Sequence, residues 1–199
     1  MTNRREFLQI GIAATAWPLA SRTALGATAA DAATRVPLYK AVYDTRFPES
    51  VAFGNQMEAQ GIATHAFAAD ITPFWYNELD AIWRETPVAV AGLTAHGPLF
   101  CLEQLGWPKG MRVVFRAEHR VAADGCVLHT LSGSAAMVRG TNGLHEATDW
   151  ATRMATLAAR CPGGRSELAK TTVKGPAVGT PRDDDDPLIS WVIAPAAKV

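Results

Sequence analysis

Seven polar side chains that follow three short apolar runs are the best candidates in this sequence for acid–base or anion-binding chemistry. They are Asp44, Thr45, Arg46, Asp70, Thr72, Thr94 and His96. Asp44, Asp70 and His96 are candidate catalytic groups, and Arg46 is the group that would orient an acidic substrate. The three threonines complete the predicted ligand-binding set. Asp and Thr at such positions are also ordinary helix caps, and Arg–Asp pairs are ordinary surface contacts.

His119 is a further catalytic candidate, on a segment of alternating apolar and polar residues at 111–121. An Asp-Gly pair separates this segment from a second β-rich run at 126–132, which predicts a hairpin. Alternation places His119 on the apolar face and His129 on the wetter face. His119, on the apolar face, is either a general base or ligand, or a buried, hydrogen-bonded core residue.

Motifs for nucleotides, metals and nucleophilic hydrolysis are missing from the sequence. There is no G-x-G-x-x-G after the first strand, no G-x-x-x-x-G-K-[ST] and no G-x-S-x-G. The five histidines show no H-x-x-x-H spacing, and the acidic run 183–186 lacks the alternation of a calcium loop. We therefore expect no metal site and no bound cofactor.

The elements that must position the candidates repeat along the chain. Pro48, Pro73 and Pro98 lie 25 residues apart, and each separates a β-rich run from a stretch with helical apolar spacing. Three βα units of this kind predict a parallel sheet with helices packed on it. Ligands of such sheets bind beyond the carboxyl ends of the strands, so the candidates of the three loops are expected to share one rim.

The remainder of the chain predicts additions to this sheet. The hairpin at 111–132 would extend it with antiparallel strands, and a helix is expected from about 147 to 161. Residues 162–187, rich in Gly, Pro, Lys and Thr, read as an exposed connection. The apolar run 188–193 predicts a strand docked on a sheet edge. Residues 33–199 are therefore expected to form one α/β domain.

Three cysteines, Cys101, Cys126 and Cys161, form no C-x-x-C pair. This spacing argues against thioredoxin-type chemistry, c-type haem and cysteine-held clusters. Each lies on an apolar stripe, which predicts buried thiols. An odd number permits at most one internal disulfide, and the sequence leaves the pairing open.

The first thirty residues resemble the bacterial twin-arginine (Tat) signal peptide, because Arg4 and Arg5 are followed by a variable residue and then Phe7 and Leu8. The apolar stretch that follows is too short to span a bilayer. Small residues place the cleavage site between Ala29 and Ala32. The resemblance implies export by the Tat translocase of residues 33–199 as a soluble periplasmic protein.

Lys plus Arg and Asp plus Glu both number 19, so bulk charge argues against nucleic acid as a partner. Proteins with signals of this type are commonly exported folded, with a cofactor or beside a cofactor-containing partner. Since no cofactor motif is present, the first hypothesis is a non-catalytic small subunit or accessory protein of an exported redox enzyme. The alternatives are a small enzyme or anion-binding protein using the strand-end rim, and a monomer with neither role. A filled rim with an exposed apolar patch would favour the subunit.

Overall fold

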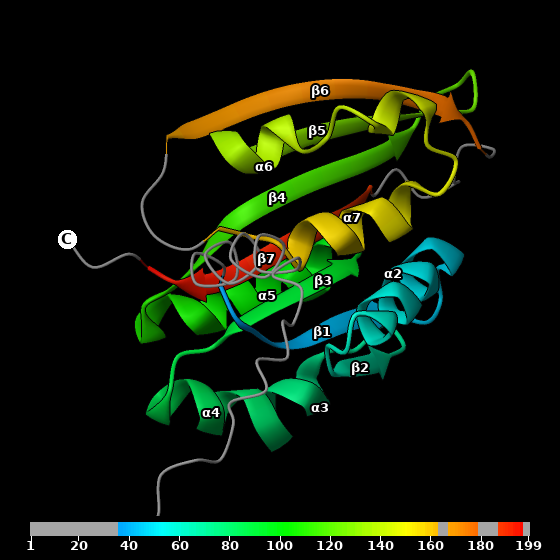
Figure 1. The fold of residues 1–199 in the computed structure, drawn as a ribbon. Coiled ribbons are helices and arrows are strands. Elements are labelled where there is room, and N and C mark those ends of the chain that lie inside the picture. Colours follow the sequence, from blue (N-terminus) through cyan, green and yellow to red (C-terminus); the bar gives the residue numbers. More distant parts are fainter. Residues whose placement is uncertain (1–35, 163–166, 179–186, 197–199) are drawn as a thin grey trace, which may run out of the picture. The chain divides into compact units, whose positions relative to one another are not determined.

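Seven strands form a single mixed sheet, with the order β2-β1-β3-β7-β4-β5-β6 (Figure 1). The computed structural model describes residues 36–162, 167–178 and 187–196. The strands are β1 (Leu38–Asp44), β2 (Thr64–Phe67), β3 (Ala89–Thr94), β4 (Met111–Val121), β5 (Cys126–Ser134), β6 (Leu168–Ala177) and β7 (Leu188–Pro195). The predicted α/β class is confirmed. The predicted signal peptide and the acidic run 183–186 lie outside the described residues.

Helices pack on both faces of this sheet. They are α2 (Pro48–Ala59), α3 (Thr72–Phe74), α4 (Asp80–Glu85), α5 (His96–Gly106), α6 (Ala135–Arg139) and α7 (Trp150–Ala158). Side chains of α2, α6 and α7 bury one face together, while those of α3, α4 and α5 bury the other. The predicted helix 147–161 is shorter, since α7 begins at Trp150 and ends at Ala158; a 3₁₀ turn, Leu144–Glu146, precedes it. Within the described residues, no helix has the length and apolar content needed to cross a bilayer.

The strands β1, β2 and β3 run parallel, with β1 between the other two. Their carboxyl ends therefore lie at the same edge of the sheet. The β3 strand is buried along its whole length, as is typical of a strand covered by helices on both sides. This edge is the rim on which the loop residues were expected to meet.

The last strand, β7, lies in the middle of the sheet, so its predicted position at an edge is wrong. It runs antiparallel to both β3 and β4 and separates them. Residues 188 to 194 are all buried. A continuous apolar run buries both faces of a strand, which is the signature of a central position and not of an edge.

The strand β6 lies inside the region that was predicted to be an exposed connection at 162–187, so that prediction is wrong for Leu168–Ala177. This strand pairs antiparallel with β5 and is the last strand on its side of the sheet. Lysines and threonines are compatible with it because an edge strand with one solvated face needs few apolar side chains. Lysines on an edge also hinder pairing with other chains.

The hairpin of β4 and β5 forms as predicted, but its register differs by one residue. His119 lies directly opposite His129, so both histidines are on the same, buried face. The predicted wet position of His129 is wrong. Because side chains alternate with a period of two, a slip of one residue transfers a side chain to the other face of the sheet.

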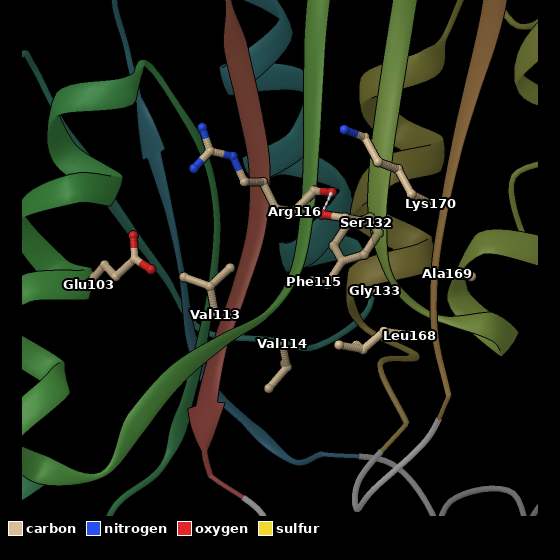
Figure 2. A pocket seen from close by; sticks show the side chains of 10 residues that line it. All are labelled: Glu103, Val113, Val114, Phe115, Arg116, Ser132, Gly133, Leu168, Ala169 and Lys170. Carbon is tan, nitrogen blue, oxygen red and sulfur yellow. Dashed lines mark hydrogen bonds between the residues drawn. The ribbon is translucent and has the colours of Figure 1, made fainter.

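Among the described residues, no helix lies over the outer face of β5 and β6, whereas α5 contacts β4. Arg116, Ser132 and Lys170 project from this face beside α5, which contributes Glu103 (Figure 2). The opposite face of the same strands packs against α7, through side chains such as Phe115 and Leu131. The hairpin and β6 are therefore half-covered, with one apolar and one solvated face.

Candidate functional site

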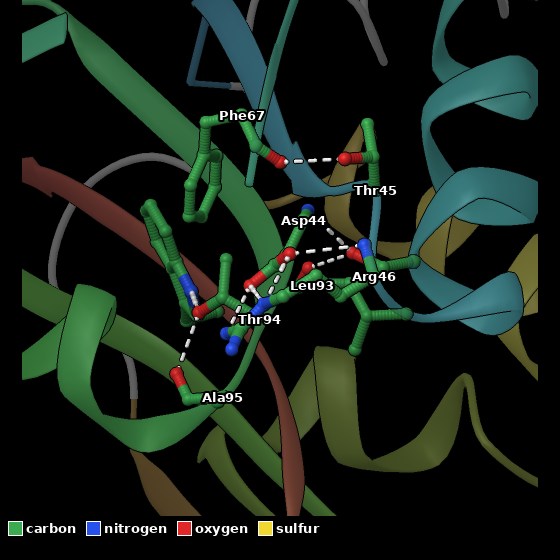
Figure 3. Close-up of polar contacts among 9 residues, drawn as sticks. Asp44, Thr45, Arg46, Phe67, Leu93, Thr94 and Ala95 are labelled. Atoms are coloured by element: carbon green, nitrogen blue, oxygen red, sulfur yellow. Dashed lines mark hydrogen bonds and ion pairs between the residues drawn. The ribbon is translucent and has the colours of Figure 1, made fainter. Parts of the chain in front are cut away.

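Asp44 is at the centre of the predicted rim, at the carboxyl end of β1. Its side chain has no exposed surface, and it forms a paired contact with Arg46 (Figure 3). Arg46 Nε donates to Asp44 Oδ1 at 3.0 Å, and Nη2 donates to Oδ2 at 2.6 Å. The Arg46 backbone N–H also donates to Oδ1, at 3.1 Å. The two residues that sequence analysis placed together are therefore bound to each other.

Neighbouring elements surround Asp44. The Asp44 N–H donates to Ser50 Oγ of α2 at 2.9 Å, and that hydroxyl donates to the Leu93 carbonyl of β3. The backbone of Ala69, after β2, helps to lower the pKa of the Asp44 carboxyl. Ala69 has φ = 65°, a left-handed conformation that is unfavourable for a residue with a Cβ. All three parallel strands thus contribute to the surroundings of one buried acid.

The ionisation of Asp44 is set by two opposing effects. Burial by itself would raise the pKa of this carboxyl, but the hydrogen bonds from Arg46 and the charge of its guanidinium outweigh burial and lower the pKa. Asp44 is therefore a carboxylate at neutral pH. A carboxylate with a low pKa that already accepts several hydrogen bonds is a poor proton acceptor for a substrate.

Two threonines of the rim, Thr45 and Thr94, form hydrogen bonds within the protein. Thr45 Oγ1 donates to the Phe67 carbonyl at 3.1 Å. Thr94 is fully buried; its hydroxyl donates to the Ala95 carbonyl at 2.8 Å and accepts from Trp191 Nε1 at 3.1 Å. These two hydroxyls stabilise the loops and the contact with β7.

Asp70, Thr72 and His96 do not join this cluster through any recorded side-chain contact. Asp70 Oδ1 accepts from the Thr72 N–H at 2.8 Å, just before α3, and this bond lowers the pKa of Asp70. Asp70 is not the N-cap of α3, because that position is Ile71. His96 is exposed and stacks on Phe100, with the ring centroids 5.9 Å apart.

His119 belongs to a buried cluster on the other side of the sheet. Its Nδ1 lies 2.7 Å from Nδ1 of His129, and its Nε2 lies 2.7 Å from Ser190 Oγ. The Trp150 ring packs on both imidazoles, with centroids at 4.3 and 5.5 Å. One Nδ1 atom must donate and the other accept, so this contact suits two neutral rings and excludes two protonated ones.

Burial holds both imidazoles in this neutral form. It lowers the pKa of His129 to about 4, and burial together with the charge of His129 lowers the pKa of His119 well below 6.5. His129 Nε2 is buried and has no hydrogen-bond partner. The pair is closed to solvent, so it acts as a polar element of the core, the second of the two interpretations that the sequence allowed.

A second polar cluster was missed by sequence analysis. The side chains of Tyr39 and Lys40 both donate to Glu78 Oε1, from Tyr39 at 2.6 Å. Glu78 lies in a π-helical turn, Trp75–Leu79, between α3 and α4. The hydrogen bond to Glu78, with burial, raises the pKa of Tyr39 to about 12. π-helical turns occur often at functional sites, but no sequence signal distinguishes this turn from the helix around it.

The cysteines differ in their accessibility. Cys101 is exposed, Cys126 is partly buried and Cys161 is buried, and all three are free thiols. The prediction of a buried thiol is confirmed for Cys161 and wrong for Cys101. Apolar side chains of α5 lie on more than one side of the helix, Leu99 and Leu102 buried and Phe100 and Leu105 exposed, so the spacing alone did not reveal which side faces the sheet.

In the part of the chain that the structure describes, no group of three His, Cys, Asp or Glu side chains is placed to hold a metal ion.

Comparison with models of known families, with characterised proteins and with solved structures finds no match to this chain.

Proposed function

We propose that this chain is an exported, non-catalytic accessory subunit that binds a redox enzyme through the outer surface of α5. The observation that carries the proposal is the composition of this surface. The exposed residues between 96 and 108 are His96, Gly97, Phe100, Cys101, Gln104, Leu105, Trp107 and Pro108, none of which is Asp, Glu, Lys or Arg. We call this set the α5 outer surface.

The α5 outer surface carries three large apolar side chains although the opposite side of the helix already packs on the sheet. Phe100 is 50% exposed, Leu105 39% and Trp107 56%, while Leu99 and Leu102 are fully buried. The exposed polar side chains of the set, His96 and Gln104, belong to residue types without a permanent charge. Large apolar side chains that stay exposed on one helix and the turn after it support a protein–protein contact.

One edge of the surface carries residue types that dominate the energetics of protein interfaces. The guanidinium carbon of Arg112 lies 3.8 Å from the centroid of the Trp107 ring. Trp and Arg are enriched among the residues that contribute most to binding. This pair favours a partner surface that has an acidic side chain next to an apolar area.

The twin-arginine pattern in the sequence supports an exported enzyme as the partner, because such signals serve chains that cross folded, alone or beside a cofactor-containing partner. We propose the periplasm as the compartment for the same reason. The ion pair between Asp44 and Arg46 gives less support to the alternative, a small-anion site at the strand ends, because the Asp44 carboxylate already binds the Arg46 guanidinium. Catalysis is not required of any residue in this proposal.

Photo-crosslinking from Cys101 tests the proposal, because this thiol is exposed on the α5 outer surface. The full-length chain with Cys126→Ser, produced in its native host, is labelled with a benzophenone maleimide in the periplasmic extract. A matched control has Cys101→Ser and Gln60→Cys, which moves the label to the exposed end of α2. The proposal expects a defined adduct with a flavin- or haem-containing enzyme from Cys101 only, and its loss in Phe100→Asp.

Several outcomes contradict the proposal. One is equal crosslinking from both label positions, and another is a Cys101 adduct with a protein that has no redox cofactor. Retention of the full-length chain in the cytoplasm would contradict the export step. The variant with Arg4→Lys and Arg5→Lys is the control for that step, since it should accumulate uncleaved inside the cell.

A further inference from the structure

A depression of about 440 Å³ lies over the outer face of β4, β5 and β6, next to α5 (Figure 2). Its volume is within the range of about 300–1,000 Å³ that is typical of sites for small molecules. Arg116, Ser132 and Lys170 form one part of its lining, and Val114 and Leu168 form an apolar part. None of these residues was a candidate in the sequence.

Strand register brings the polar part together. Arg116 of β4 is directly opposite Ser132 of β5, which is directly opposite Lys170 of β6. Neighbouring strands lie about 4.8 Å apart, so the two cations originate about 10 Å apart with a hydroxyl between them. Their long side chains can close on a single carboxylate from both sides. The Ser132 hydroxyl has only a long bond, at 3.4 Å, to the Arg116 carbonyl.

The positive charges of Arg116 and Lys170 are only partly balanced by neighbouring carboxylates. Arg116 Nη2 pairs with Glu118 Oε1 at 2.9 Å, but the buried Arg116 Nε has no acceptor. For Lys170 no acidic partner is recorded among the described residues, whereas Lys174 of the same strand pairs with Asp124 at 2.6 Å. One positive charge therefore remains at this end of the depression, which favours an anionic group there.

Glu103 of α5 brings the opposite charge to the same depression, beside the apolar part (Figure 2). A simple monocarboxylate would leave this acid without a counterpart. A molecule that carries a carboxylate, an ammonium group and an apolar body satisfies all three parts of the lining at once.

We propose that this depression binds a short peptide of apolar residues, of about dipeptide size. The terminal carboxylate lies between Arg116 and Lys170, the terminal ammonium group faces Glu103, and the apolar side chains pack on Val114 and Leu168. This site is independent of the partner surface proposed above. Glu103 is only partly exposed, at the side of α5 next to β4, whereas Phe100 and Leu105 are on its exposed side.

Titration of the full-length protein with leucyl-leucine, followed by two-dimensional amide NMR, tests this site. The expected result is saturable shifts at Gly133 and Ala169, which line the depression. N-acetyl-leucyl-leucine lacks the ammonium group and leucyl-leucinamide lacks the carboxylate, so each is expected to bind about tenfold more weakly. Phe100→Asp, which disrupts the α5 outer surface, should leave peptide binding unchanged.

Variants assign each charge to its residue. Lys170→Gln should weaken leucyl-leucine binding about tenfold, while Lys174→Gln, on the same strand and already paired with Asp124, should leave it unchanged. Glu103→Gln should remove the preference for the free over the acetylated peptide. Absence of saturable shifts up to about 10 mM peptide would overturn the proposal. So would equal binding by wild type and Lys170→Gln, or equal affinity of wild type for the acetylated and free peptides.

Discussion

The buried pair His119 and His129 should make the protein unstable in mild acid. Their Nδ1 atoms are 2.7 Å apart, so protonation of both rings would direct two N–H groups at each other inside the core. In the unfolded chain each imidazole titrates near 6.5, whereas burial lowers the pKa of His129 to about 4 and that of His119 well below 6.5. Between these limits the unfolded state binds more protons, so the free energy of unfolding must fall as the pH decreases.

The size of this effect follows from the shift of His129. With a pKa of 6.5 unfolded and about 4 folded, this histidine lowers the free energy of unfolding by about 2 kcal/mol between pH 7.5 and pH 5.0. Burial and the neighbouring His129 also lower the pKa of His119, so this residue changes the stability in the same direction. His65, whose pKa is also lowered by burial, adds in the same direction. This is a large part of the usual stability of a domain.

Urea unfolding at pH 7.5 and pH 5.0, monitored by tryptophan fluorescence, measures this difference. In His129→Leu the loss of stability on acidification should shrink by about 2 kcal/mol, and the comparison is made within the variant, so a lower absolute stability does not affect it. The control is His145→Gln, because the His145 side chain is 57% exposed and should leave the difference unchanged.

A second measurement does not depend on a variant. Histidine ring NMR on the wild-type protein should show two imidazoles that stay neutral at pH 5.5. The reasoning is refuted if the wild type loses less than about 1 kcal/mol between the two pH values, or if His129→Leu retains the full loss.

Two further predictions concern close packing and thiol access. Gly92→Ala should lower the free energy of unfolding by about 3 kcal/mol or more, because a Cβ at this position would lie 2.4 Å from the Trp191 ring. Gly97→Ala on α5 is the control: a Cβ there has no atom within 4 Å, so this variant should raise the free energy of unfolding by up to about 1 kcal/mol. Urea unfolding measures both. A similar loss for both variants would contradict the packing argument. Cys101 should react at once with a thiol reagent, while Cys161, buried and with its pKa raised to about 11, should react only as fast as the protein unfolds. Rapid modification of both thiols in native protein would show that the packing around Cys161 is open.

Much of the sheet was predictable because local signals agreed with the tertiary environment. Alternation around an Asp-Gly turn was sufficient to predict that β4 and β5 pair, although not their register. Apolar runs bounded by proline predicted strands and helices in the first half of the chain. Asp44 and Arg46 are two residues apart, so their pairing is also a local matter.

The sequence by itself determined that the chain alternates strands and helices and that polar residues follow the first three strands. Tertiary structure decided the order of the strands, which inserts β7 between β3 and β4, and the register that brings His129 to His119. It also decided that α5 leaves one apolar side uncovered and that Arg116, Ser132 and Lys170 form a row across three strands. The physical reason is that strand pairing joins residues far apart in the chain through backbone hydrogen bonds, which are the same for every side chain. Only the packing of the complete sheet selects one arrangement.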